Sequence, residues 1–131
     1  MTPKKTVVLD ASAILASIFN EPGAEKLTDD VLDIAVASTV NLAEVQTKLV
    51  RMNYDPDQAW EDALNLVNTA EPYTSEQAKI AGTLAANTRH LGLSLGDRSC
   101  LALAIELKAE VFTTEKSWKQ LKIGVPIHLL R

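Results

Sequence analysis

Short apolar runs alternate with helix-forming segments along this chain, and that alternation restricts its fold more than any other feature. Residues 6–9 form a continuous run rich in β-branched side chains, which is typical of a strand buried on both faces. Similar runs predict strands at 33–37, 110–113 and 124–129, and the proline-containing connector 69–73 suits a short edge strand. Strands that alternate with helices predict a parallel sheet covered by helices on both faces.

The chain has 131 residues, 47% of them hydrophobic, which is enough for one domain with a sizeable core. We therefore expect a single α/β domain over residues 1–131, built as three layers around a mainly parallel sheet of four or five strands. Cap-like polar residues, prolines and glycines bound the expected helices. These are predicted at 13–19, 24–32, 39–52, 56–67, 74–89 and 97–108, and a further short helix begins at 114.

The charge balance narrows the classes of function. Seventeen acidic side chains against thirteen Lys and Arg give a net charge of −4, which argues against nucleic-acid binding through a bulk positive field. It does not exclude an enzyme that meets a phosphate backbone through metal ions. A single cysteine and the absence of a signal-peptide or membrane-spanning pattern predict a cytoplasmic protein with no membrane partner.

Four acidic residues occupy corresponding places in the predicted fold. Asp10 and Glu115 directly follow predicted strands, Glu44 is expected in the first turn of a helix, and Asp97 stands where another helix begins. Ligands of parallel sheets bind at the carboxyl ends of the strands, so these carboxylates are expected to meet at one edge. Taken singly, each acid also has an ordinary interpretation as a helix cap or a first-turn residue that favours the helix dipole.

Taken together, four converging carboxylates would repel one another strongly unless a cation lay between them. Helix N-termini offset only part of that repulsion, since each carries about half a positive charge. Hard oxygen ligands without a His or Cys cluster favour Mg²⁺ or Mn²⁺ over zinc. Such an ion keeps several waters, binds phosphates and can activate a water for attack at phosphorus. The residues therefore predict metal-dependent phosphate chemistry.

Four segments of the chain also resemble the successive motifs of PIN-domain proteins, most closely the VapC toxin group of bacterial and archaeal toxin–antitoxin systems. The segments are Val7–Leu15, Asn41–Val45, Leu93–Ala104 and Thr113–Trp118. The resemblance covers essentially the whole chain and implies a three-layer PIN-like fold and a Mg²⁺- or Mn²⁺-dependent endoribonuclease that inhibits translation.

The same resemblance implies roles for particular residues. Asp10, Glu44 and Asp97 would form the acidic core of the metal site. Glu115 stands where the family usually has an aspartate, so we expect it to act through water or from outside the ligand sphere. Ser12 and Thr113 match small hydroxyl positions near the site, although a cap and a strand-end role explain them equally well.

Partners are predicted on the same basis. RNA would be the substrate. From its place next to Asp97, Arg98 could steer an RNA phosphate, although a solvated surface charge also explains it. A cognate antitoxin and a second copy of the chain are the implied protein partners. Apolar residues in excess of one small core would supply those contacts, although ordinary core packing explains most of them: Leu15, Ile18, Phe19, Trp60, Leu64 and Val67.

Two other classes of protein remain open from the sequence. Asp10 could be the covalent nucleophile of a phosphatase-like or receiver-like α/β protein, although Ser12 stands where an aspartyl-phosphatase has a second aspartate. The chain could instead be a catalytically weakened module that binds metal, RNA or protein, an interpretation that the departure at Glu115 allows.

Overall fold

Five short strands form one sheet in the order β3-β2-β1-β4-β5, and every neighbouring pair is parallel. The computed structural model describes residues 5–131. The strands are β1 (Val7–Leu9), β2 (Ala35–Ser38), β3 (Thr69–Glu71), β4 (Glu110–Thr113) and β5 (Ile127–Leu129). The predicted parallel sheet is therefore confirmed, and the proline-containing connector does form an edge strand.

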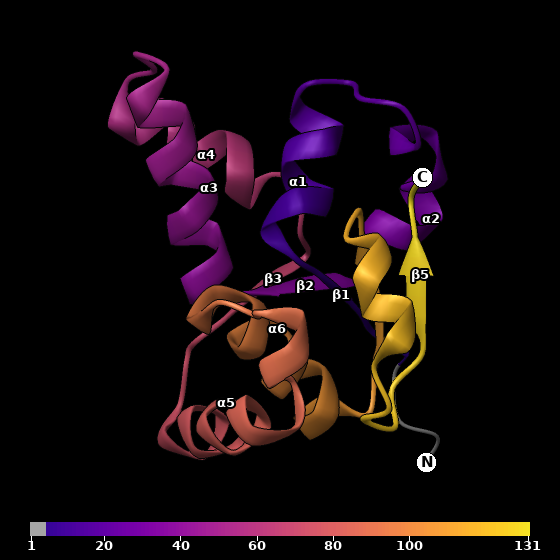
Figure 1. Ribbon diagram of the computed structural model, residues 1–131. Helices are drawn as coiled ribbons and strands as arrows, with labels where there is room; N and C mark the ends of the chain where they lie inside the picture. Colours follow the sequence, from indigo (N-terminus) through magenta and orange to yellow (C-terminus); the bar gives the residue numbers. More distant parts are fainter. Residues whose placement is uncertain (1–4) are drawn as a thin grey trace.

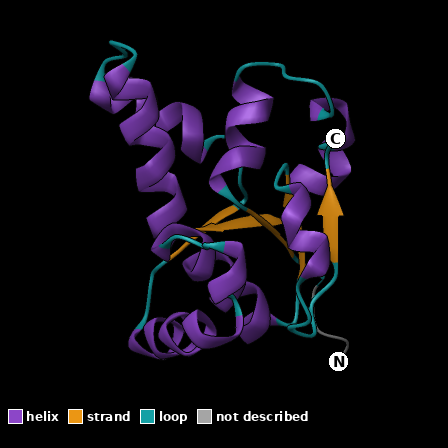
Figure 2. Cartoon of the chain, viewed as in Figure 1, coloured by secondary structure: helices purple, strands orange, loops and turns teal. Residues whose placement is uncertain are grey.

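Side chains of the central strand alternate between two core clusters, as the period of a pleated strand requires. Val7 and Leu9 belong to one cluster and Val8 to the other, and all three are buried. The first cluster lies under α1 (Ala11–Ile18), α3 (Thr39–Arg51) and α4 (Pro56–Leu64), and the second under α5 (Ser75–Asn87) and α6 (Leu95–Leu107). Figures 1 and 2 show these two helical layers on opposite sides of the sheet.

Shorter helical segments join these elements: η1 (Ala24–Lys26), α2 (Asp29–Leu32), η2 (Arg89–Leu91) and η3 (Lys116–Gln120). The prediction of one continuous helix over 24–32 was wrong. A 3₁₀ turn ends at Lys26, and Thr28 then caps a new helix by accepting a hydrogen bond from the Val31 amide. The helix predicted to begin at 114 is a 3₁₀ segment that starts at Lys116.

Two helix boundaries bear on the acidic residues. Glu44 is not in a first turn, because α3 begins at Thr39 and Ser38 is its N-cap. The helix expected at 97–108 begins two residues earlier, with Ser94 as N-cap, so Asp97 is its third residue. The helix expected at 56–67 ends at Leu64.

The order of the strands places a topological switch point between β1 and β4. The chain leaves β1 to build β2 and β3 on one side, then crosses the sheet to add β4 and β5 on the other. The connections therefore diverge between β1 and β4, and in open parallel sheets such a switch point is where ligands bind, at the carboxyl ends of the strands.

Few large hydrophobic side chains are exposed on the described part of the chain. Among residues 5–131, no helix is long and apolar enough to cross a membrane. The six apolar residues considered for partner contacts are all half-buried against the α1–α3–α4 core cluster, which agrees with the ordinary packing interpretation. The exposed large hydrophobic side chains are instead Val50, Met52, Leu95 and Leu107.

Candidate active site

Asp10 lies at the carboxyl end of β1 with both carboxylate oxygens held by donors. It is the N-cap of α1, and its Oδ1 accepts the Ala13 amide at 2.8 Å. Thr113, the last residue of β4, donates from Oγ1 to Oδ2 at 2.6 Å. Ser12 Oγ lies 2.8 and 2.9 Å from the two oxygens. The predicted cap and the predicted proximity of both hydroxyls are thus present in one network across the switch point.

Backbone amides fix the direction of these hydroxyl groups. The Thr114 amide donates to Ser12 Oγ at 3.0 Å, and the Glu115 amide donates to Thr113 Oγ1 at 3.0 Å. Because each hydroxyl oxygen accepts from an amide, its own proton is free to point at Asp10. The segment after β4 therefore holds two side-chain donors against one carboxylate.

Burial and these hydrogen bonds oppose each other at Asp10. The side chain is 3% exposed, and this desolvation raises its pKa from 3.8 to about 6. Hydrogen bonds from Thr113, Ala13 and Ser12 lower the pKa, while the negative charge of Asp97 raises it further. The result is a carboxylate that is fixed in place and that a nearby cation would stabilise.

Glu44 lies on α3 at the border between the protein and solvent. Asn41, one turn earlier, donates from Nδ2 both to Glu44 Oε1 at 2.8 Å and to the Gly96 carbonyl oxygen of α6 at 3.0 Å. Partial burial raises the pKa of Glu44, the Asn41 hydrogen bond lowers it, and the Asp97 charge raises it. One buried amide thereby holds the acid of α3 against the first turn of α6.

Gly96 is the surface against which the Glu44 carboxylate lies. A Cβ at this position would overlap the carboxylate group of Glu44, so the glycine provides space and not an unusual backbone angle. The other amide atom of Asn41, Oδ1, is buried and has no hydrogen-bond partner among residues 5–131. The Asn41 side chain is 1% exposed, so its orientation is set by the contacts of Nδ2.

Asp97 completes a capping box at the start of α6. Its amide donates to Ser94 Oγ at 3.1 Å, and its Oδ2 accepts the Ser94 amide at 3.0 Å. The capping role considered from the sequence is confirmed. Within the described chain its other oxygen, Oδ1, accepts no hydrogen bond, so the cap holds the side chain while leaving one oxygen available.

Asp10, Glu44 and Asp97 form one electrostatic group. The charge of Asp97 raises the pKa of both other acids, and all three charges add to the burial that raises the pKa of the Cys100 thiol. Cys100 is fully buried in the core between the sheet and α6. Glu115 is exposed, and its charge is not among those that act on these groups.

The donor set suits a hard divalent cation that keeps part of its water shell. Within residues 5–131, no three Asp, Glu, His or Cys side chains stand close enough together to enclose a metal ion. Mg²⁺ typically binds through one or two carboxylates plus waters, so a preformed cage is not required. Three mutually repelling carboxylates, one oxygen of Asp97 being free, fit such an ion better than they fit zinc.

Arg98 is engaged away from these acids. Its guanidinium donates from Nη1 to the Ala81 carbonyl oxygen of α5 at 2.9 Å, which ties the two helices on that face. This contact gives Arg98 a role in packing α5 against α6, and its steering of RNA stays a prediction.

Sequence reasoning missed the roles of Asn41 and Gly96. Asn41 entered the sequence analysis only as the first residue of the Asn41–Val45 segment, and in the structure it lies inside α3, which Ser38 caps. The available signals were an amide three residues before an acid, and a glycine in the first turn of a helix. Neither signal indicates that the two residues, 55 positions apart, touch each other.

These features define an all-parallel α/β domain with one buried carboxylate, Asp10, at the switch point of its sheet. The charge of Asp97 on α6 acts on Asp10 and on Glu44 of α3. The family model described as PIN domain matches residues 7–124. The chain therefore belongs to the PIN domain family. A comparison with curated proteins gave no significant match.

Several solved structures share the fold. A DNA-bound VapBC complex from Salmonella typhimurium has a chain with TM-score 0.78 and 16% identity, covering 98% of this chain and 100% of that one. VapBC-1 from nontypeable Haemophilus influenzae gives TM-score 0.70 and 20% identity, covering 95% and 98%. VapBC2 from Rickettsia felis, bound to a promoter DNA fragment, gives 0.73 and 16%, covering 94% and 97%.

Proposed function

We propose that this protein is a Mg²⁺- or Mn²⁺-dependent endoribonuclease and the toxin of a type II, VapBC-like toxin–antitoxin system. The observation that carries the proposal is that Asp97 of α6 lies near enough for its charge to act both on Asp10, after β1, and on Glu44 of α3, which Asn41 holds against the first turn of α6. Membership of the PIN domain family and the VapBC structures that share the fold support it.

The residues divide the work in the proposed reaction. Asp10, Glu44 and Asp97 would hold the ion or ions, which when bound would activate water and neutralise charge on the phosphate. Ser12 and Thr113 keep Asp10 ionised and fixed by donating to it, and Asn41 holds Glu44 toward α6. Glu115, exposed after β4, would act through water at the margin of the site.

The proposal extends to partners and place of action. Cleavage of RNA phosphodiesters in the cytoplasm would inhibit translation, and a cognate antitoxin would restrain it. A homodimer is proposed as the free form of the toxin. A small DNA-binding-type protein in the neighbouring reading frame would support the antitoxin assignment.

The environment of Asp10 favours this proposal over an aspartyl-phosphate mechanism. An aspartyl-phosphatase has a second aspartate two residues after its nucleophile, whereas this chain has Ser12 there, with its hydroxyl 2.8 and 2.9 Å from the two Asp10 oxygens. A trapped acyl-phosphate on Asp10 would reverse that preference.

The test is purified protein, free of any partner, incubated with total RNA and Mg²⁺ or Mn²⁺. We expect discrete cuts by the wild type, and loss of at least about 100-fold in rate for Asp97→Asn, which keeps the cap but removes the charge. Asp57→Asn is the control, because Asp57 is also a first-turn acid, on α4. Equal cleavage by wild type and Asp97→Asn would refute the site. Metal or RNA binding without turnover would instead identify a catalytically weakened module.

A further inference from the structure

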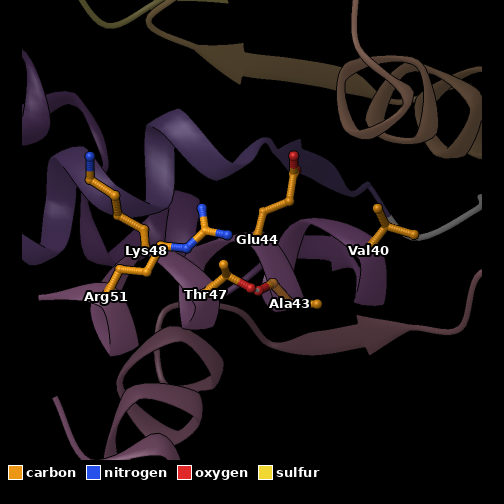
Figure 3. A pocket seen from close by; sticks show the side chains of 6 residues that line it. All are labelled: Val40, Ala43, Glu44, Thr47, Lys48 and Arg51. Carbon is orange, nitrogen blue, oxygen red and sulfur yellow. Dashed lines mark hydrogen bonds between the residues drawn. The ribbon is translucent and has the colours of Figure 1, made fainter. Parts of the chain in front are cut away.

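One face of α3 carries two cations in line with the acid of the proposed site. Glu44, Lys48 and Arg51 are spaced i, i+4 and i+7, so they share a helical stripe. The opposite stripe, formed by Leu42, Val45 and Leu49, is buried in the core. In Figure 3 the Glu44 and Lys48 side chains extend to the same side of the helix.

These residues line one open depression of about 600 Å³. Its walls are Val40, Ala43, Glu44, Thr47, Lys48 and Arg51, all on α3. The helix leads away from the carboxyl edge of the sheet, as Figure 1 shows, so the depression starts at the proposed site and continues outward. With a rise of 1.5 Å per residue, Arg51 lies about 10 Å beyond Glu44 along the helix axis.

The two cations have no internal partner. Both side chains are exposed, and neither Lys48 nor Arg51 forms an ion pair or donates a hydrogen bond to any residue in the described part of the chain. Their position in the last turns of α3 favours the helix dipole. That effect explains their sign, but it does not require them to line up with Glu44.

An acidic protein that binds RNA must do so through local cations, because its overall field repels phosphate. Arginine offers a fork that matches a phosphate, and lysine offers a compact charge with three donors. We infer that the Lys48–Arg51 stripe is the phosphate path on which single-stranded RNA lies as it enters the site. This inference rests on the proposed ribonuclease function and names where that substrate is held.

The test measures binding without cleavage, by fluorescence anisotropy of a labelled single-stranded RNA with EDTA present, over a series of salt concentrations. The variant Lys48→Gln/Arg51→Gln is expected to bind about tenfold more weakly at low salt. Two lost phosphate contacts are expected to reduce the slope of log affinity against log salt by about 1.4. The exchange variant Lys48→Arg/Arg51→Lys keeps both charges and is expected to keep the slope.

A matched control lies at the other edge of the sheet. Lys5 and Lys108 also line one depression, of about 490 Å³, at the amino ends of β1 and β4. The variant Lys5→Gln/Lys108→Gln removes the same charge and is expected to bind RNA as the wild type does. Circular dichroism of each variant establishes that it is folded.

Each outcome separates the inference from the function on which it rests. An unchanged affinity and salt slope in the α3 variant would overturn the inference, even if the wild type cuts RNA. Equal losses in both double variants would also overturn it, since binding would then depend on net charge alone. Loss of antitoxin binding with RNA binding intact would make the stripe a protein interface. Loss of RNA binding specific to the α3 variant would support the path, even in a protein that proves not to cut RNA.

Discussion

Asp10 and Glu44, two acids of the proposed site, are held under opposite conditions. Asp10 is buried at the junction of β1 and β4, where the backbone and two hydroxyls supply donors to both of its oxygens. Glu44 reaches the border of the site from a solvent-exposed stripe and is held by one amide, that of Asn41. The contrast shows one acid fixed by the sheet and one positioned by the contact between α3 and α6.

A fixed, buried carboxylate is expected to cost stability wherever it is ionised. The folded pKa of about 6 lies above the unfolded value of 3.8, so Asp10 contributes stability below pH 3.8 that is lost as pH rises through 6. The difference between these two pKa values corresponds to about 3 kcal/mol in the free energy of unfolding. This is the largest effect expected from the comparison of the two acids.

Urea unfolding of wild type and Asp10→Asn from pH 3.5 to 7.5, with EDTA present, measures it. The free energy of unfolding of the variant is expected to gain about 3 kcal/mol relative to wild type across this range. Hydrogen bonds lost in Asp10→Asn lower its free energy of unfolding by the same amount at every pH, so the change with pH relative to wild type remains. A difference that stays flat with pH would show that Asp10 is not held as described, whereas Asp57→Asn should leave the wild-type profile unaltered.

A substitution at Gly96 is expected to displace the Glu44 carboxylate. In Gly96→Ala the new Cβ overlaps the Glu44 carboxylate, which can swing away toward solvent at small cost to the fold. We expect Mn²⁺ affinity to fall about 10- to 100-fold while the melting temperature changes little. Isothermal titration calorimetry measures the affinity.

Gly82→Ala is the control for this glycine, because Gly82 is also helical and a Cβ there meets nothing within 4 Å. That substitution should leave Mn²⁺ binding intact and stabilise α5 by about 0.5–1 kcal/mol. Unchanged Mn²⁺ affinity in Gly96→Ala would remove Glu44 from the proposed site.

A smaller effect is expected from Asn41, which positions Glu44 without being a ligand. Asn41→Leu removes the donor to both Glu44 and Gly96, and we expect about a tenfold loss of Mn²⁺ affinity with about 1–2 kcal/mol of stability.

Gln77→Leu provides the comparison for Asn41. Gln77 is also a buried amide whose nitrogen donates to a glutamate on α6, Glu106, at 2.8 Å. Its loss should cost similar stability and leave Mn²⁺ binding alone. Equal Mn²⁺ affinities in the two leucine variants would reduce Asn41 to a packing residue.

Prediction from the sequence succeeded where a local pattern has one structural solution. The β-branched run before Asp10 forms the expected buried strand, and Asp97 lies in the first turn of a helix, as expected. The number of layers and the parallel sheet followed from the order of such segments.

What escaped prediction depends on tertiary contacts. Glu44 was expected in a first turn, although the helix was predicted from residue 39, where it does begin. Its placement against α6 depends on the contact of Asn41 with Gly96, 55 positions away. The bond from Thr113 to Asp10 joins residues 103 positions apart, and sequence spacing holds no record of that pairing. Glu115 is exposed and its charge is not among those that act on Asp10, while its predicted role outside the ligand sphere stays a prediction.

The central claim is that Asp10, Glu44 and Asp97 together bind a divalent cation. Mn²⁺ binding, followed by the loss of the free-ion electron paramagnetic resonance signal, tests it directly in wild type, Asp97→Asn and Asp57→Asn. The account predicts that wild type and Asp57→Asn bind Mn²⁺ alike and that Asp97→Asn binds at least about tenfold more weakly. Mn²⁺ binding of equal strength in Asp97→Asn, or none in the wild type, would contradict it.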